Sequence, residues 1–422
     1  GQLFNSYPHQ LSGGQKQRVM IAMAIACKPQ LLIADEPTTA LDVTVQQTIL
    51  DLLKDLQKEY NMGMIFITHD LGVVAQIAQK IVVMYKGKTV EQGNVQQIFN
   101  APQHPYTKGL IACKPPLNSR PERLLTVADF LNESISIPII KQIEQTQRTT
   151  AHQKLYAVNP LLQVQKLTTQ FITKKGFIKP TTTILNAVDE VSFDVYKGET
   201  LGLVGESGCG KSTLGRSILR LIEPSAGKII YNNRNLLELS ANEMLQMRSK
   251  MQLIFQDPFS SLNPRITVGN AIAEPIEVHG IAKNKDEIRE KVMKLLLRVG
   301  LTEQHFDRYP HEFSGGQRQR IGIARTLAVE PEFIVCDESV SALDVSVQAQ
   351  VLNLLNELKE EFKLTYIFIS HDLSVVKYMC DKIIVMQKGK IVEMAEADEL
   401  YLNPQSEYTK KLIDAIPTTQ MV

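Results

Sequence analysis

The sequence predicts an α/β fold with a mostly parallel sheet core, arranged as two copies in tandem. Short apolar segments alternate with amphipathic segments of helical period, which is the pattern of parallel strands joined by helical crossovers. A glycine-rich stretch at residues 205–212 follows one apolar segment and precedes a helical one. Residues 1–120 return, without a gap, as residues 303–422.

The apolar segments have the length and composition of buried strands. Leu31 to Ala34 and Phe333 to Cys336 are continuous apolar runs, as expected for strands covered on both faces. Residues 45–58 and 347–361 carry apolar side chains at three- and four-residue spacing and are predicted helices. Ligands bind beyond the carboxyl ends of parallel strands, so the residues that follow these strands are candidates for a site. The other predicted elements are strands at 64–67, 161–171, 188–193, 200–204 and 366–369 and a helix at 213–221.

The repeat divides the chain into one partial and one complete copy of the same unit. Residues 7–18 match residues 309–320, an offset of 302 (309 − 7). Asp35-Glu36 and Asp337-Glu338 are related by the same offset. The glycine-rich stretch has no counterpart, because its equivalent would precede residue 1. We therefore expect the C-terminal half of a first unit, followed by a whole second unit.

The glycine-rich stretch, Gly205-Glu-Ser-Gly-Cys-Gly-Lys-Ser212, follows the pattern G-x-x-x-x-G-K-S of a phosphate-binding loop. Its glycines let backbone N–H groups surround a phosphate, and the start of the next helix adds a positive dipole end. Lys211 would reach the β- and γ-phosphates, and the Ser212 hydroxyl would ligate Mg²⁺. A tight glycine turn is the alternative, which the rest of the chain disfavours. The residues expected around the nucleotide are Gly205, Glu206, Ser207, Gly208, Cys209, Gly210, Lys211, Ser212 and Thr213.

Length and composition limit the class of protein. At 422 residues the chain exceeds the size at which a single core stops growing, so more than one domain is expected. Lys+Arg number 46 and Asp+Glu 45, whereas a nucleic-acid-binding protein needs a clustered basic excess. The chain has no long apolar run and no basic-then-apolar start, so neither a membrane span nor a signal peptide is expected. The five cysteines form no C-x-x-C pair, which favours a reduced, cytosolic chain without a cysteine metal site.

The segment between the copies, residues 117–158, contains a Gln/Thr-rich run at 142–150 and lacks sustained periodicity. This composition is typical of a linker. The expected parts are the C-terminal half of a first nucleotide-binding domain (1–116), the linker (117–158), a complete second domain (159–402) and a C-terminal tail (403–422).

The motifs of the second copy resemble those of the ATP-binding subunits of ABC transporters, and the resemblance covers nearly the whole chain. Asp337-Glu338 resemble the Walker B motif with its catalytic glutamate, and His371 resembles the switch histidine. The other matches are Gln256 with the Q-loop glutamine, Ser314-Gly-Gly-Gln317 with the signature motif and Ser341-Ala-Leu-Asp344 with the D-loop. The resemblance implies the P-loop NTPase fold of this family, the ABC ATPase fold, with an α-helical signature subdomain beside the sheet.

The resemblance assigns a chemical role to each of these residues. Asp337 would hold Mg²⁺ through its water shell. Glu338 would orient and polarise the water that attacks the γ-phosphate, and His371 would contact that phosphate or that water. Gln256 would sense the metal and the water. The expected catalytic residues are Glu338, His371 and Gln256, and the expected metal site is Ser212, Gln256 and Asp337. A surface or helix-cap role is the alternative for Glu338 and for His371.

The signature motif begins a predicted helix in each copy, since Ser12-Gly-Gly precedes residues 15–26 and Ser314-Gly-Gly precedes residues 317–328. Two glycines at a helix N-terminus let the backbone approach an anion closely. In the family that anion is the γ-phosphate held by the opposite domain of a head-to-tail pair. The resemblance therefore implies one composite site within this chain, in which the second copy's phosphate loop faces the first copy's signature. Its first-copy residues would be Ser12, Gly13, Gly14 and Gln15.

The first copy also keeps counterparts of the other motifs. These are Asp35 and Glu36 of Walker B, Thr39-Ala-Leu-Asp42 of the D-loop and His69 of the switch. The second copy's signature, Ser314 to Gln317, has no further phosphate loop in this chain on which to close.

Further motifs resemble the importer group for dipeptides and oligopeptides, which includes nickel and glutathione importers. They are residues 255–264, residues 341–348 and His104-Pro-Tyr-Thr107. The resemblance implies ATP and Mg²⁺ as cofactors. It implies as partners two transmembrane permease subunits, met by the region 257–308, and an extracytoplasmic solute-binding protein. The chain would lie peripherally on the cytoplasmic face of the bacterial inner (plasma) membrane. The cargo stays open, because the partners choose it.

Two alternatives to an importer ATPase remain. A twin-cassette protein without permeases, acting on the ribosome or on DNA, would carry a long, highly charged helical arm, whereas the segment 117–158 has few charges and includes Pro121 and Pro138. An inactive, truncated gene product is the other alternative. The adenine-stacking residue also stays open, with Phe171 and Phe177 as candidates.

Overall fold

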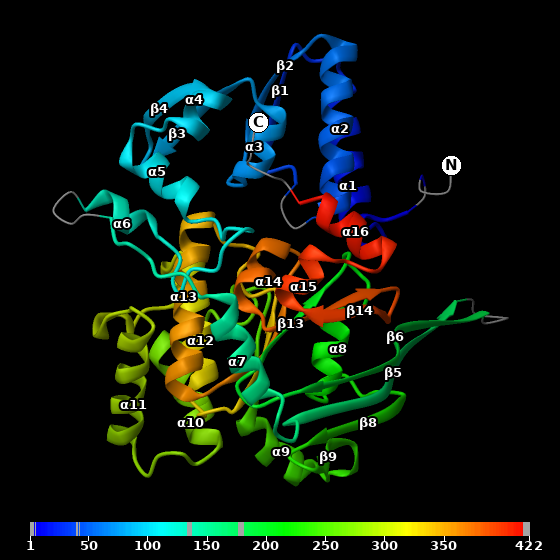
Figure 1. Ribbon diagram of the computed structural model, residues 1–422, viewed down its shortest axis with the longest axis vertical. Helices are drawn as coiled ribbons and strands as arrows, with labels where there is room; N and C mark the ends of the chain where they lie inside the picture. Colours follow the sequence, from blue (N-terminus) through cyan, green and yellow to red (C-terminus); the bar gives the residue numbers. More distant parts are fainter. Residues whose placement is uncertain are drawn as a thin grey trace.

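The computed structural model describes residues 4, 6–38, 41, 43–132, 137–175 and 181–416. Figure 1 shows the first copy as the upper part, in blue and cyan, above the larger second copy, in green to red. Both copies alternate strands and helices, as the sequence predicts. No described helix has both the length and the apolar character needed to cross a membrane.

The second copy is built on a six-stranded sheet in the order β10-β11-β12-β7-β13-β14. All neighbouring strands are parallel except β13 and β14, which are antiparallel. Every residue of β7, β11 and β12 is buried, which confirms the prediction of strands covered on both faces. The strands are β7 (Thr200–Val204), β10 (Met251–Ile254), β11 (Phe333–Asp337), β12 (Thr365–Ile369), β13 (Lys382–Gln387) and β14 (Lys390–Glu396).

A second, antiparallel sheet has the order β6-β5-β8-β9. Its strands are β5 (Leu162–Lys175), β6 (Thr181–Val195), β8 (Ala226–Tyr231) and β9 (Arg234–Asn235). The helices α10, α11 and α12 pack on one another and form the expected helical subdomain, in which α12 begins at the signature motif. The helices are α8 (Lys211–Ile218), α9 (Ala241–Lys250), α10 (Val268–Val278), α11 (Lys285–Arg298), α12 (Gly315–Leu327), α13 (Val345–Phe362), α14 (Leu373–Met379), α15 (Ala397–Leu402) and α16 (Glu407–Asp414).

The first copy repeats these elements but arranges its strands differently. Its described residues form two separate two-stranded sheets, β1-β2 and β3-β4, whereas β7 lies between the corresponding strands, β12 and β13, of the second copy. The elements are α1 (Gly13–Ile25), β1 (Leu31–Asp35), α2 (Val43–Tyr60), β2 (Gly63–Ile67), α3 (Leu71–Ile77), β3 (Lys80–Tyr85), β4 (Lys88–Asn94), α4 (Val95–Asn100) and α5 (Pro105–Ala112).

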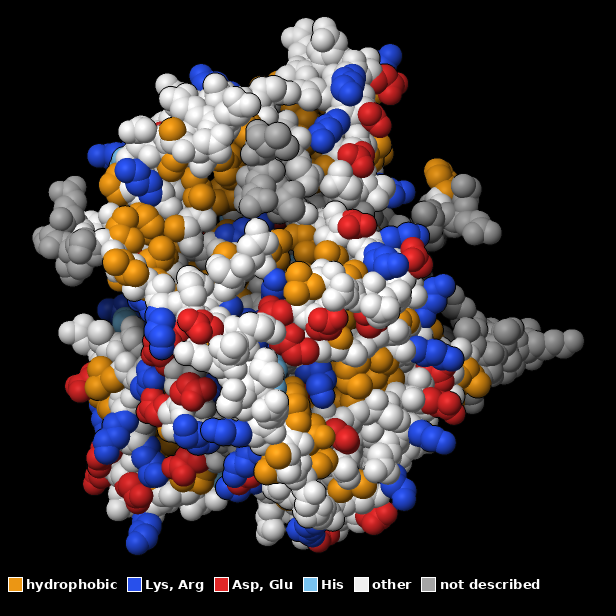
Figure 2. Space-filling view, in the orientation of Figure 1, with side chains coloured by type: hydrophobic (Ala, Val, Ile, Leu, Met, Phe, Trp, Pro, Cys, Tyr) orange, Lys and Arg blue, Asp and Glu red, His pale blue; other side chains and the backbone are white. Residues whose placement is uncertain are grey.

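This arrangement leaves apolar strand residues of the first copy at the surface. Ile33 is 62% exposed and Met84 is 60% exposed, whereas their counterparts Val335 and Met386 are fully buried. Figure 2 shows hydrophobic side chains gathered on the upper part of the molecule, over the first copy. The prediction that the 31–34 strand is covered on both faces is therefore wrong for the first copy. The same sequence pattern gives a strand in both copies, but only the second supplies the elements that cover it.

The segment expected to be a linker connects the two copies and also packs against the second. It contains two helices, α6 (Val127–Leu131) and α7 (Gln145–Leu155). Leu124 and Val127 join the second copy's main hydrophobic core. The buried amide of Asn353 donates to the Leu124 carbonyl and accepts from its N–H, both at 2.9 Å. The sequence does not reveal α7, because its only buried residue is Arg148, so it has no apolar stripe.

Two buried arginines of this segment bind the second copy. The Arg120 guanidinium donates to the carbonyls of Lys377 and Cys380 at the C-terminal end of α14, and it lies 3.4 Å from Asp398. Arg148 pairs with Glu396 and with Asp398. A cation at a helix C-terminus also interacts favourably with the helix dipole. The connecting segment therefore holds the C-terminal end of α14, the helix that follows His371.

We expect Arg120→Ala to destabilise the second copy by about 3 kcal/mol, because the change leaves the helix-end carbonyls without their buried cation and removes one of the two arginines that pair with the largely buried Asp398. Arg123→Ala is the matched control, since the Arg123–Asp129 pair is 2.6 Å long but the arginine is 41% exposed. The control should cost at most about 1 kcal/mol. Urea unfolding followed by circular dichroism measures both, and equal losses would contradict the role assigned to Arg120.

Candidate nucleotide-binding site

The phosphate loop has a backbone shape that only glycine allows at two positions. Gly205 and Gly210 have φ of +145° and +108°. A Cβ on Gly205 would lie 2.2 Å from the Met386 carbonyl oxygen, and one on Gly210 would lie 2.0 Å from the Ala187 carbonyl oxygen. The loop therefore presses against its neighbours on one side. At Gly208, with φ of +79°, a Cβ would meet open space, as expected for a loop that leaves room for a ligand.

Lys211 lies inside this loop. Its side chain is buried, and Nζ donates to the Gly205 carbonyl at 2.7 Å and to the Glu206 carbonyl at 3.0 Å. Helix α8 begins at Lys211, two residues earlier than predicted, so the loop leads directly into a helix N-terminus. A buried ammonium group and a helix N-terminus both favour an anion at this position.

The residues expected to hold a divalent cation also meet. Asp337, which ends β11 and is 1% exposed, accepts a hydrogen bond from the Ser212 hydroxyl at 2.6 Å. Its other oxygen lies 3.3 Å from the Arg216 guanidinium. Hydroxyl and carboxylate oxygens are the donors that Mg²⁺ prefers, so the two residues fit the ion. Arg216 was not predicted, although it lies four residues after Ser212 and so on the same face of α8.

Glu338 directly follows Asp337 at the end of β11, where it meets Gln256 and His371. The Gln256 amide donates to Glu338 Oε2 at 2.7 Å, and His371 Nδ1 lies 3.6 Å from the same oxygen. The structure thus brings Gln256 to Glu338, and a role for Gln256 at the metal stays a prediction. Glu338 itself has φ of +46°, a left-handed conformation unusual for glutamate.

The two charged side chains shift each other's pKa. Burial opposes ionisation of Glu338, but neighbouring His371 and Lys211 outweigh it, so the pKa of Glu338 lies below its usual value. Burial likewise disfavours the charged form of His371, but the Glu338 carboxylate outweighs it and raises the pKa of His371. The pair therefore favours an ionised glutamate beside a protonated histidine.

The first copy reproduces part of this geometry. Glu36 has φ of +45°, and its Oε1 lies 3.0 Å from His69 Nδ1. The D-loop counterpart lies largely outside the described residues, which include Leu41 but not Thr39, Ala40 or Asp42.

The signature motifs cap helices in both copies, as predicted. The Ser12 hydroxyl accepts from the Gln15 N–H at 3.3 Å, and the Ser314 hydroxyl accepts from the Gln317 N–H at 3.4 Å. Ser12, Gly13 and Gln15 are exposed and Gly14 is half-buried, at the start of α1. Across the described part of the chain, no hydrogen bond or ion pair joins these four residues to the phosphate loop.

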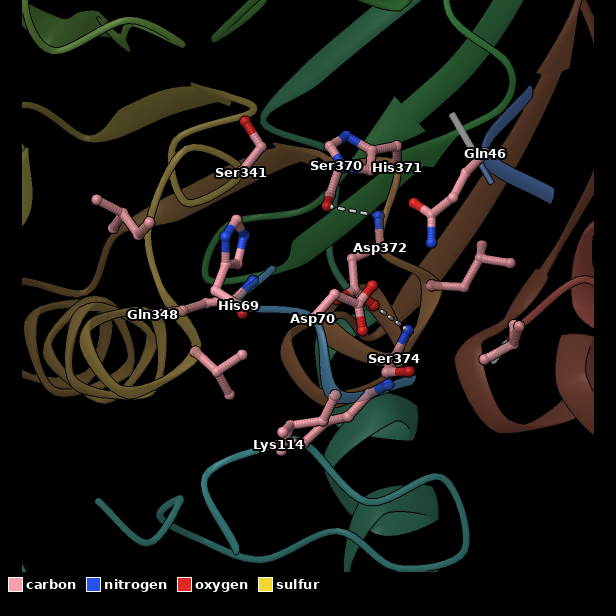
Figure 3. Close-up of a pocket in the computed structure, with 15 residues that line it drawn as sticks. Gln46, His69, Asp70, Lys114, Ser341, Gln348, Ser370, His371, Asp372 and Ser374 are labelled. Carbon is pink, nitrogen blue, oxygen red and sulfur yellow. Dashed lines mark hydrogen bonds between the residues drawn. The ribbon is translucent and has the colours of Figure 1, made fainter. Parts of the chain in front are cut away.

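A pocket of about 110 Å³ lies between the two copies. Figure 3 shows His69 and Asp70 of the first copy approaching the same space as His371 and Asp372 of the second. These residues are related by the repeat offset of 302 (371 − 69). Further residues that line the pocket pair in the same way, namely Gln46 with Gln348 and Leu71 with Leu373. The two copies therefore meet through equivalent surfaces, as expected for a pair related by approximate two-fold symmetry.

Neither candidate for adenine stacking is tested by this geometry. Phe171 lies on β5 and is 43% exposed. Phe177 lies outside the described residues.

Comparison with known proteins agrees with this geometry. The sequence matches the family described as ABC transporter over residues 2–39 and 188–341. It matches the oligopeptide/dipeptide transporter C-terminal region over residues 90–132 and 392–421, so the second of these regions begins before the tail expected at 403.

Curated relatives extend the similarity over nearly the whole chain. Glutathione import ATP-binding proteins of Shigella dysenteriae serotype 1 and Escherichia coli K12 are each 50% identical to it over 420 residues, or 99% of this chain. The chain spans 66% of the length of these relatives. Solved structures are similar as well. A dimeric bacterial ABC transporter cassette is 28% identical, with a TM-score of 0.50, over 56% of this chain and 98% of that one. A dimeric cassette bound to ADP and Pi in a post-hydrolysis state is 27% identical, with the same score and coverage.

The fold, the strand-end site and these similarities agree on one class, the ATP-binding cassette. The chain belongs to the ATP-binding proteins of ABC transporters, in the oligopeptide/dipeptide importer group.

We expect the wild-type protein to have a higher free energy of unfolding than a His371→Gln variant at low pH. This difference should become smaller as the pH rises. The pKa of His371 is raised in the folded state, so its protonation stabilises the fold below the unfolded pKa, and this contribution is lost as the pH rises through the folded pKa. Glu338, whose pKa is lowered, stays ionised throughout. Urea unfolding of nucleotide-free protein between about pH 6 and about pH 9 measures the difference. A difference independent of pH would show that the pair does not form.

Proposed function

We propose that this chain hydrolyses ATP and thereby powers solute import by an ABC transporter. The observation that carries the proposal is the convergence of two pairs of side chains beside the phosphate loop, Ser212 with Asp337 and Gln256 with Glu338. Hydrolysis needs a phosphate cradle, a divalent-cation site and a carboxylate that can accept a proton from water. Neighbouring strand ends supply all three kinds of group.

Each group has one task in this proposal. The backbone of residues 205–213 and the Lys211 ammonium bind the phosphates. Ser212, Asp337 and Gln256 hold Mg²⁺, which when bound neutralises charge on the phosphates. Glu338 orients the attacking water, and its lowered pKa keeps it ionised for that task. His371 fixes the position of that water or of the γ-phosphate.

The transport part of the proposal draws on the relatives, whose printed name is glutathione import ATP-binding protein. We propose two permease subunits and an extracytoplasmic solute-binding protein as partners, a peptide-like solute such as glutathione as cargo, and a peripheral position on the cytoplasmic face of the inner membrane. A groove beside the Q-loop supports a permease contact. It is lined by Phe255, Pro275, His279, Gln319 and Arg325, among others. These similarities favour an importer over a ribosome- or DNA-associated twin cassette, and the assembled site favours an active protein over an inactive product.

Glu338→Gln should lower the rate of ATP hydrolysis at least about 100-fold while nucleotide still binds, because the amide cannot accept the proton of water. Glu36→Gln is the matched control, since Glu36 has the same backbone conformation but lies outside the proposed site. Phosphate release and binding of a labelled nucleotide are the measurements. Equal loss in both variants would contradict the assignment of Glu338.

The same two variants test import. In cells that carry the permeases and the solute-binding protein, Glu338→Gln should stop uptake of labelled glutathione or dipeptides and Glu36→Gln should not. Retained uptake in the Glu338 variant would contradict the transport function.

The proposed site is completed by the first copy's signature motif. Support comes from the pocket between the copies, where equivalent residues such as His69 and His371 face each other. That arrangement matches a head-to-tail pair, in which Ser12, Gly13, Gly14 and Gln15 would close on nucleotide held by the second copy.

Gly13→Asp should therefore lower ATP turnover about tenfold or more, whereas Gly315→Asp should change it little. An aspartate at a helix N-terminus does not oppose the helix, but it repels a phosphate. A Cβ at Gly13 would lie 3.2 Å from the Leu41 side chain, which would have to shift slightly, and one at Gly315 would lie 4.0 Å from Leu343 in ordinary contact. Steady-state hydrolysis measures the effect, and a larger loss at Gly315 would contradict the pairing.

A further inference from the structure

The C-terminal helix of the second copy touches the phosphate loop. Tyr408, the second residue of α16, accepts a hydrogen bond at its hydroxyl from the Glu206 N–H, at 3.0 Å. The contact joins residues 202 positions apart in the chain. It links the region matched to the oligopeptide/dipeptide transporter C-terminal family with the first turn of the loop.

The contact completes the bonding of one peptide group. The Gly205 carbonyl and the Glu206 N–H belong to the same planar unit. The carbonyl accepts from Lys211 at 2.7 Å, and the N–H donates to Tyr408 at 3.0 Å. Gly205 has φ of +145°, so this peptide group adjoins a residue with wide backbone freedom. The two hydrogen bonds therefore fix an orientation that the backbone alone does not fix.

Hydrogen bonds to the sheet and packing against the core fix the position of Tyr408. Glu393 on β14 accepts the N–H groups of Gln405 at 2.8 Å and of Ser406 at 2.9 Å. The Ser406 hydroxyl then caps α16 by accepting the Tyr408 N–H at 3.2 Å. One helical turn further along the same face of α16, Leu412 packs into the main core. The position of the hydroxyl thus depends on the sheet edge and on the core.

The first copy offers an internal comparison. Glu91 accepts the N–H groups of Gln103 at 2.7 Å and of His104 at 3.1 Å, so the support is the same. The counterpart of Tyr408, however, is Tyr106, whose ring stacks on Tyr85 at 4.2 Å between centroids. The second copy has Gln387 in place of Tyr85. The same glutamate anchoring thus holds a tyrosine that stacks on another ring in the first copy and a tyrosine that contacts the phosphate loop in the second.

We propose that Tyr408 is a positioning residue for nucleotide binding, which holds the 205–206 peptide group in the orientation that the phosphate loop needs. The inference rests on the proposed function. When Lys211 turns to a phosphate, as the loop pattern requires, the Gly205 carbonyl loses its donor. The Tyr408 hydroxyl then remains to hold the peptide group. The C-terminal region thereby sets the affinity of the site for nucleotide.

The test compares Tyr408→Phe with Tyr106→Phe in the full chain. Each change removes one hydroxyl and keeps the ring, at positions related by the repeat. We expect Tyr408→Phe to raise the Kd for ATP and the KM of hydrolysis about three- to tenfold, the usual effect of one lost hydrogen bond, with kcat within about twofold. Tyr106→Phe should leave all three unchanged.

A second readout separates positioning from simple stability. The thermal midpoint without nucleotide should be alike in the two variants, whereas the rise in midpoint on adding ATP should be smaller only in Tyr408→Phe. Wild-type Kd and KM values in Tyr408→Phe, or an equal change in Tyr106→Phe, would overturn the inference. Failure of the wild-type chain to bind ATP would instead overturn the proposed function.

Discussion

The site depends on the order of three parallel strands. Because β11, β12 and β7 are neighbours in one sheet, their carboxyl ends open at the same edge. At or just beyond these ends lie Asp337 and Glu338, then His371, and then the phosphate loop. The strands are fully buried, so displacing any of them would disrupt the core as well as the chemistry. The rigidity of the sheet lets polar groups from residues more than a hundred positions apart meet within hydrogen-bond distance.

Local sequence patterns predicted most of this architecture. Buried strands and amphipathic helices leave a periodic pattern, and the repeat doubled the evidence for each element. The phosphate loop was predictable because its backbone shape requires glycine at particular positions. At Gly210, for example, a Cβ would collide with the Ala187 carbonyl. The burial of the 31–34 strand on both faces was predicted wrongly, because burial depends on packing elements that lie outside this segment of the sequence.

Contacts between distant residues were not predictable. Arg216 beside Asp337, Tyr408 on the phosphate loop and Arg120 at the end of α14 all depend on the tertiary fold. Helix α7 escaped prediction for a related reason, since it binds through Arg148 and not through an apolar face. In each case the chemistry is that of a single polar side chain, which carries no period in the sequence.

The segment bonded to α14 has a consequence for the pair of copies. Two separate cassettes must find each other again whenever they part, at a rate set by their concentration in the cell. Here Arg120 and Arg148 bond the connecting segment to the second copy, so only a short stretch of chain lies between α5 of the first copy and this attachment. The effective concentration of one copy around the other is then set by that short tether. Under the proposed pairing of the two copies, such a tether makes their association independent of expression level.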